Sequence, residues 1–93
     1  MRISDKKREK ISEQILATLF SSTPKSLFTA HIAQEIARDE EFIKGLLLEL
    51  KSKKLIVEIK KNPKGIDYLR RARWRLSDAT YEAYKNHQEE KII

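Results

Sequence analysis

The apolar residues of this chain change from helical to strand spacing near residue 54. Before that point they recur every three or four residues, which is the period of amphipathic helices. After it, "LIVEIKK" and "RARWRL" alternate apolar and polar residues, which is the period of strands, and a last helical stretch follows. The pattern predicts an α+β fold that is mostly α: helix, short strand, two helices, hairpin, helix.

Capping and helix-breaking residues set the limits of these elements. Pro24, within the polar turn "SSTPKS", ends the first helix, and Leu27-Phe28 are expected to form a very short strand. The last five residues, "EEKII", are expected to fray. The predicted helices cover residues 5–20, 29–37 (N-cap Thr29), 40–53 (N-cap Asp39) and 78–88 (capped by Ser77 or Asp78).

The two alternating segments are expected to form one hairpin over residues 55–76. Gly65 supplies the positive φ that its turn needs. The predicted core-facing partners are Leu55 with Leu76, Val57 with Trp74, and Ile59 with Ala72.

The length of the chain sets further limits. Ninety-three residues make one domain, 1–93, with a small core. There is no cysteine, which excludes disulfides, thiol catalysis and the usual zinc-finger ligands. With no apolar run near the length of a membrane span and no secretory leader pattern, the chain is expected to be cytoplasmic.

Positive charge is concentrated in one segment. Residues 51–75 hold ten Lys and Arg against two acids, a balance of +8, whereas the rest of the chain holds ten cations and twelve acids, a balance of −2. The net charge of +6 therefore belongs to this segment, and a polyanion is the natural partner for such a field.

The predicted pairing also places charges opposite one another on the outward face of the hairpin. Glu58 opposite Arg73 would form an ion pair, but Lys60 opposite Arg71 and Lys61 opposite Arg70 would repel, at a cost of up to ~1 kcal/mol each. A phosphate backbone would relieve that repulsion and release counterions. The alternative is a solvated edge hairpin whose lysines block aggregation.

A resemblance to a known fold family supports nucleic-acid binding. The segment "FTAHIAQEIARDEEFIKGLLLELKSKKLI", followed by a hairpin and "WRLSDATYEAY", resembles the winged-helix DNA-binding domains of small archaeal and bacterial regulators of the MarR, ArsR and PadR type. The resemblance implies that residues 40–53 are the recognition helix, that the hairpin is the wing, and that the protein dimerises through its terminal helices.

The helix over 40–53 is expected to face outward with Glu40, Glu41, Lys44, Gly45 and Leu48. The acids at its start either complement the helix dipole or, at Glu41, accept a hydrogen bond from cytosine N4. Lys44 is the expected direct contact, and Lys51 would reach the DNA backbone. The full set of predicted nucleic-acid contacts is Lys44, Lys51, Lys60, Lys61, Lys64, Arg70, Arg71 and Arg73.

The remaining aromatic residues have two readings each. Trp74 is expected in the core rather than as a stacking platform, whereas Tyr68, near the wing tip, could contact nucleic acid.

The last helix either packs on the first helix of its own chain or joins it in a dimer interface. The residues predicted for that interface are Ile11, Tyr81 and Tyr84.

No catalytic set stands out, so an enzyme is not expected. His31 with Glu35 and His87 with Glu90 have helix-face spacing but no further ligands, so no metal and no cofactor are predicted. The predicted function is a double-stranded DNA-binding protein, a small dimeric transcriptional regulator. The alternatives are a winged-helix protein-interaction module and a sequence-nonspecific architectural or RNA-binding protein.

Overall fold

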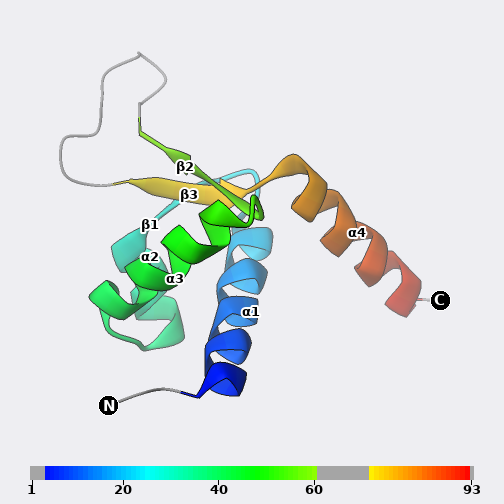
Figure 1. The fold of residues 1–93 in the computed structure, drawn as a ribbon. Helices are drawn as coiled ribbons and strands as arrows, with labels where there is room; N and C mark the ends of the chain where they lie inside the picture. Colours follow the sequence, from blue (N-terminus) through cyan, green and yellow to red (C-terminus); the bar gives the residue numbers. More distant parts are fainter. Residues whose placement is uncertain (1–3, 61–71, 93) are drawn as a thin grey trace.

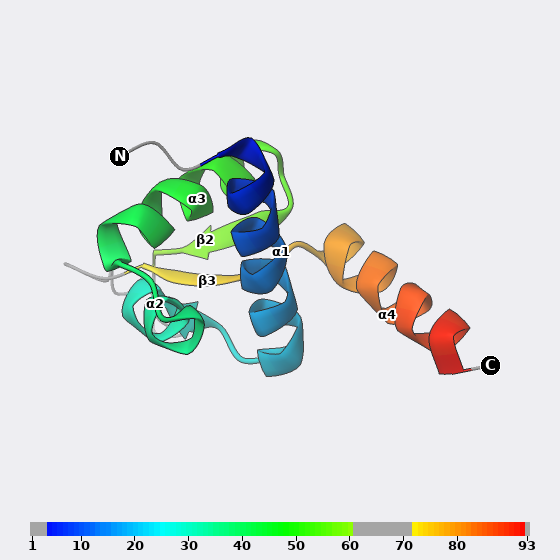
Figure 2. The same cartoon turned by 90° about the horizontal axis from the view of Figure 1, so that it is seen from below.

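The computed structural model describes residues 4–60 and 72–92. Three helices lie on one face of a small sheet, and the last helix projects away from them (Figures 1 and 2). The elements are α1 (Asp5–Ser22), β1 (Leu27–Phe28), α2 (Thr29–Ile36), α3 (Glu40–Ser52), β2 (Ile56–Ile59), β3 (Arg73–Leu76) and α4 (Asp78–Ile92). The expected order of elements and the α+β, mostly helical class are confirmed.

Three of the four helices begin at a side-chain cap. Ser4 caps α1 by accepting a hydrogen bond from the Lys7 amide, and Asp39 caps α3 by accepting one from the Phe42 amide at 3.2 Å, as predicted. The Ser77 hydroxyl accepts from the Thr80 amide, so Ser77 rather than Asp78 caps α4. This last helix continues to Ile92 instead of ending at residue 88, because the sequence offers no glycine or proline to stop it.

The prediction for the start of α2 was wrong. Phe28 occupies the N-cap position without a side-chain hydrogen bond, and Thr29 is the first helical residue. The Thr29 hydroxyl instead accepts a hydrogen bond from the indole Nε1–H of Trp74, at 2.8 Å. The Thr29 hydroxyl oxygen, expected to accept from an amide of α2, therefore accepts from the buried indole of Trp74 on β3 instead.

Two turns place a non-glycine residue in the left-handed region. Ala37, which ends α2, has φ 60° and ψ 48°, and Lys54, which follows α3, has φ 64°. The Ala37 amide donates to the carbonyl of Gln34, and the Lys54 amide donates to that of Lys51. The two turns set the direction in which the chain enters and leaves α3.

The sheet is antiparallel, with β3 between β1 and β2. The observed pairs are Ile56 with Leu76, Val57 with Arg75, Glu58 with Trp74 and Ile59 with Arg73. The predicted pairing was therefore wrong by one residue. The segment "LIVEI" offers apolar residues to both faces, with Leu55, Val57 and Ile59 on one and Ile56 beside Glu58 on the other, so alternation alone did not fix which face points inward.

This register changes the expected face of β2. Ile56, 2% exposed, faces the core beside Trp74 and Leu76, whereas Val57 and Ile59 are half-buried on the other face of the sheet. Glu58 lies opposite Trp74 and Arg73 lies opposite Ile59, so the expected cross-strand pairing of Glu58 with Arg73 is wrong. The like-charged pairs expected from the same register, Lys60–Arg71 and Lys61–Arg70, include residues outside the described ones.

The core is filled from α1, α2 and α3 and from the central strand. Trp74 is 1% exposed, as predicted, and sits among aliphatic side chains of α1, α2 and α3. Ile11 is 3% exposed and belongs to this same core, so its side chain is not available to a second copy of the chain. The largest fully buried side chains are Trp74, Ile15, Leu19, Ile32, Ile43, Leu46 and Leu47.

The projecting helix α4 is anchored near its start by aromatic contacts. The rings of Tyr81 and Tyr84 lie 5.5 and 5.6 Å from that of Phe20, at the end of α1. Burial raises the pKa of the Tyr84 hydroxyl, and the carboxylate of Glu13 raises it further. Both tyrosines therefore pack on α1 of their own chain, while the later part of α4 extends away from the domain (Figure 1).

Among the described residues, no helix combines the length and the apolar character that a membrane crossing requires.

The hydrogen bond between Thr29 and Trp74 gives a test of the packing. We expect Thr29→Val to lower the free energy of unfolding by about 1–3 kcal/mol, because it leaves a buried indole donor without an acceptor. Urea denaturation measures the change. Thr18→Val is the matched control, since that hydroxyl bonds only to the Gln14 carbonyl of its own helix. Equal losses in the two variants would contradict the assigned role.

Candidate nucleic-acid interface

The helix α3 has one buried and one exposed face. Ile43, Leu46, Leu47 and Leu50 are buried in the core. As predicted, Glu40, Glu41, Lys44, Gly45 and Leu48 are exposed on the opposite face. Lys44 forms no ion pair within the described part of the chain, so its ammonium group is available to an external anion.

The acids at the start of α3 lie where the helix dipole favours them. Glu40 and Glu41 are exposed in the first turn, directly after the capping Asp39. This placement agrees with a capping role. It also leaves Glu41 on the same exposed face as Lys44, so the arrangement permits the alternative of a base contact.

Glu58 joins the end of α3 to the base of the hairpin. Its carboxylate, whose side chain is 14% exposed, lies 2.7 Å from the Lys51 ammonium and 3.9 Å from that of Lys60. Lys51 and Lys60, both predicted as phosphate contacts, are therefore brought together around one acid. The two lysines and the one carboxylate together keep a net positive charge, and 71% of the Lys60 side chain is exposed.

Arg73 lies on the face of the sheet that points away from the helices. It pairs with Phe28 across β1 and β3, and its guanidinium carbon lies 4.5 Å from the centre of the Phe28 ring. Such a cation–π contact fixes the position of the guanidinium. Arg73 is half-buried, and its contact with a phosphate stays a prediction.

The other predicted contacts, Lys61, Lys64, Arg70 and Arg71, lie outside the described residues, as does Tyr68. The predicted contact residues that the structure describes occupy three places: Lys44 on the exposed face of α3, Lys51 with Lys60 around Glu58, and Arg73 beside Phe28.

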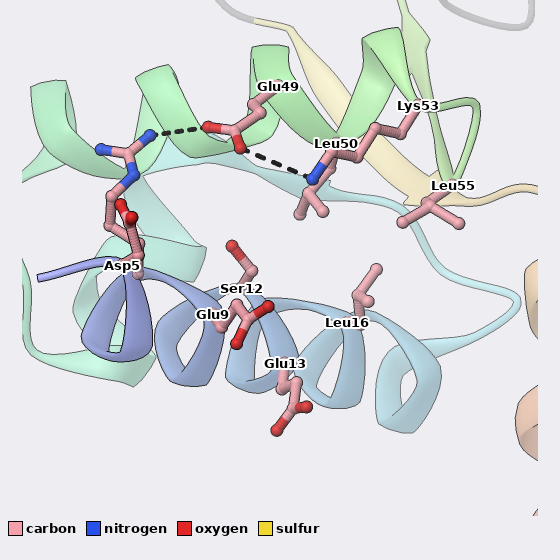
Figure 3. A pocket seen from close by; sticks show the side chains of 10 residues that line it. Asp5, Glu9, Ser12, Glu13, Leu16, Glu49, Leu50, Lys53 and Leu55 are labelled. Atoms are coloured by element: carbon pink, nitrogen blue, oxygen red, sulfur yellow. Dashed lines mark hydrogen bonds and ion pairs between the residues drawn. The ribbon is translucent and has the colours of Figure 1, made fainter.

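A groove of about 410 Å³ lies between α1 and the end of α3 (Figure 3). Glu49 stands at its edge, 2.6 Å from the Arg8 guanidinium and 3.6 Å from the Lys53 ammonium. The hydrogen bond from Arg8 lowers the pKa of the Glu49 carboxyl, and Lys53 acts in the same direction. Sequence reasoning missed this contact because 41 residues separate Arg8 from Glu49 and no local pattern links them.

The described residues offer no grouping of three His, Asp or Glu side chains placed to hold a metal ion. His31 and Glu35 are both exposed on α2, and the His31 ring lies 6.4 Å from that of Phe28.

Comparison with known proteins identifies the fold. No protein-family model matches the sequence, and no curated protein matches it. Among solved structures, the DNA complex of Staphylococcus aureus MepR is similar, with a TM-score of 0.68 and 23% identity, over 94% of this chain and 73% of the other. The E41A mutant of Lactococcus lactis ZitR is similar with a TM-score of 0.65 and 19% identity, over 99% and 60% of the two chains.

A third similar structure is the Zalpha domain of Carassius auratus PKZ in complex with Z-DNA. Its TM-score is 0.59 at 18% identity, and the match covers 76% of this chain and 98% of that domain. This chain spans between 50% and 73% of the MepR and ZitR chains that it matches. The similarities, together with the order of elements, show that the chain has the winged-helix fold, and the resemblance seen in the sequence is confirmed at the level of the fold.

The contact between Arg8 and Glu49 predicts a dependence of stability on pH. Because the folded carboxyl has a lowered pKa, its contribution is present above the ordinary value of 4.5 and is lost as the pH falls through the folded value. We expect Glu49→Gln to lower the melting temperature at pH 7, and the difference from wild type to shrink below pH 4.5.

Glu9→Gln is the matched control, since Glu9 lines the same groove without an ion pair among the described residues. Melting curves from pH 3 to 7 make the comparison. A gap between wild type and Glu49→Gln that stays constant over this range would contradict the assignment.

Proposed function

We propose that this protein is a double-stranded DNA-binding regulator that places α3 in the major groove. The observation that carries the proposal is the exposed face of α3: Lys44 lies on it without an internal partner in the described chain, and the cation-rich segment 51–75 begins at its end. B-DNA has a major groove wide enough for an α-helix. Lysines flanking the helix would meet the phosphates on either side.

Structures of similar fold support this choice of partner. The MepR structure is a complex with DNA and the Zalpha structure is a complex with Z-DNA. Neither shares more than 23% of its residues with this chain, so these complexes support the class of ligand rather than a particular sequence or contact.

The charge distribution supports binding through phosphates. Lys60, with Lys61 and Lys64 beyond it in the sequence, would contact the backbone, and Lys51 would reach it from the end of α3. Arg70 and Arg71 would enter the neighbouring minor groove, which the arginine side chain fits. Each neutralised phosphate releases counterions, so affinity falls as salt rises. Two copies that make about eight phosphate contacts would give a slope of log K against log salt of about −7.

A salt titration tests this mechanism. We expect a slope of about −7 for wild type on a duplex, falling to about −2 when Lys60, Lys61 and Lys64 are all changed to Gln, because six of about eight contacts are lost from two copies. Fluorescence anisotropy measures the affinity at each salt concentration.

The control variant changes Lys6, Lys7 and Lys10 to Gln, which removes the same charge from exposed positions of α1. It should keep the slope of wild type. A slope near zero for wild type would rule out the mechanism, and equal slopes for the two triple variants would rule out a special role for the hairpin. Equal affinity for a selected duplex, a random duplex and RNA would indicate an architectural or RNA-binding protein instead.

We further propose that the protein acts as a homodimer through α1 and α4. The support is the shape of α4, which projects beyond its contacts with Phe20, and the small core of a 93-residue chain, for which association is a common source of stability. Tyr81 and Tyr84 of α4 are half-buried against α1, at the base of the proposed dimer surface.

Sedimentation equilibrium tests the dimer. We expect a species of twice the 11.0 kDa mass of one chain, shifted toward monomer in Tyr84→Ser. The circular dichroism of that variant shows whether its helices persist. A single species of 11.0 kDa at all concentrations would refute the dimer while leaving the fold and the DNA contact untouched.

A further inference from the structure

Two residues on the exposed face of α3 lie outside the hydrophobic core of the described chain. Leu48 is 47% exposed and is the one large apolar side chain exposed among residues 4–60 and 72–87. Gly45 lies in the middle of the helix, and a Cβ built on it would meet no atom within 4 Å.

Both residues are unfavourable for the isolated domain. An exposed leucine keeps apolar surface in water. A glycine inside a helix lowers helix stability relative to alanine, and the packing around Gly45 gives no reason for it because alanine fits without a close contact. The fold therefore explains neither choice, whereas contact with a ligand explains both.

The two residues lie together. Leu48 is three positions after Gly45 and four after Lys44, so all three are neighbours on one side of the helix surface. The absence of a side chain at Gly45 lets another surface approach the helix backbone closely. Beside this approach point lie a cation at Lys44 and an apolar end at Leu48.

In the major groove this combination fits one base. A leucine side chain forms no hydrogen bonds, so it reads only an apolar feature of a base edge, and the thymine 5-methyl group is the apolar group displayed there. Lys44 is placed to hold the neighbouring phosphate or the acceptors of a guanine.

We propose that Leu48 reads the methyl group of a thymine in the target duplex, with Gly45 allowing the close approach that this contact needs. This inference rests on the proposed placement of α3 in the major groove. It makes Leu48 a specificity-determining residue and predicts a T·A pair at the position that Leu48 contacts.

The experiment removes the proposed apolar contact first from the DNA and then from the protein. A duplex is first recovered by selecting random-sequence DNA with the wild-type protein, and each thymine is then replaced by uracil, which lacks only the 5-methyl group. At one position in each half-site we expect uracil to weaken binding about fourfold, as for the loss of one buried methyl group. Leu48→Ala should weaken binding to the thymine duplex and should no longer distinguish uracil from thymine there.

Two further variants serve as controls. Leu48→Met keeps an apolar side chain and should retain most of the sensitivity to uracil. Gly45→Ala should raise the melting temperature and yet weaken duplex binding, because the added methyl group stabilises the helix but blocks the approach. A misfolded variant would not show this opposite pair of effects.

The outcomes separate this inference from the proposed function. If wild type binds the selected duplex but every uracil substitution is silent, or if Leu48→Ala keeps full sensitivity to uracil, the reading of thymine is wrong and DNA binding stands. If wild type recovers and binds no duplex, the proposed function fails, and the exposed leucine belongs to a protein contact instead.

Discussion

The position of Trp74 is the constraint on which the rest of the structure depends. This side chain sits on β3, the central strand, and is buried against the helices, so it fixes where the sheet meets the core. Its indole N–H also binds the Thr29 hydroxyl at the start of α2. Because α2 packs on α3 through the same core, this one residue relates the sheet, α2 and the exposed face of α3 to one another. The proposed contact surface is therefore set by burial on the opposite side of α3.

The cations of the candidate interface differ in how firmly the fold holds them. Lys51 and Lys60 share Glu58, and Arg73 lies on the Phe28 ring, whereas Lys44 has no ion pair in the described chain. A lysine already held near its place loses less side-chain freedom on meeting a phosphate, but it must also be separated from its carboxylate. A lysine without an ion pair loses more side-chain freedom when it binds a phosphate, but it has no carboxylate to leave. The described surface thus combines positioned charges at the hairpin base with an adaptable one on α3.

Local patterns predicted the helices well, because apolar spacing and caps are properties of neighbouring residues. The stripe of α3 and the cap at Asp39 came directly from the sequence. The pairing of β2 did not, since the sequence favours the more apolar face of Leu55, Val57 and Ile59, whereas the fold turns Ile56 inward and leaves Glu58 opposite Trp74. The partners of Thr29 and of Arg8 were also beyond local reasoning, because Trp74 and Glu49 lie more than 40 positions away. Of the candidate site, the exposed residues of α3 were predictable, and the sharing of Glu58 by two lysines was not.

The left-handed turns at Ala37 and Lys54 make the domain less stable than it would be with glycine at these positions. A side chain with a Cβ in that conformation costs roughly 1–2 kcal/mol compared with the right-handed one, a cost that glycine does not carry. Both turns adjoin α3 but lie off its outward face. Glycine at Ala37 would therefore make the domain more heat-resistant without altering any cation, whereas glycine at Lys54 would gain the same stability at the loss of one positive charge from segment 51–75.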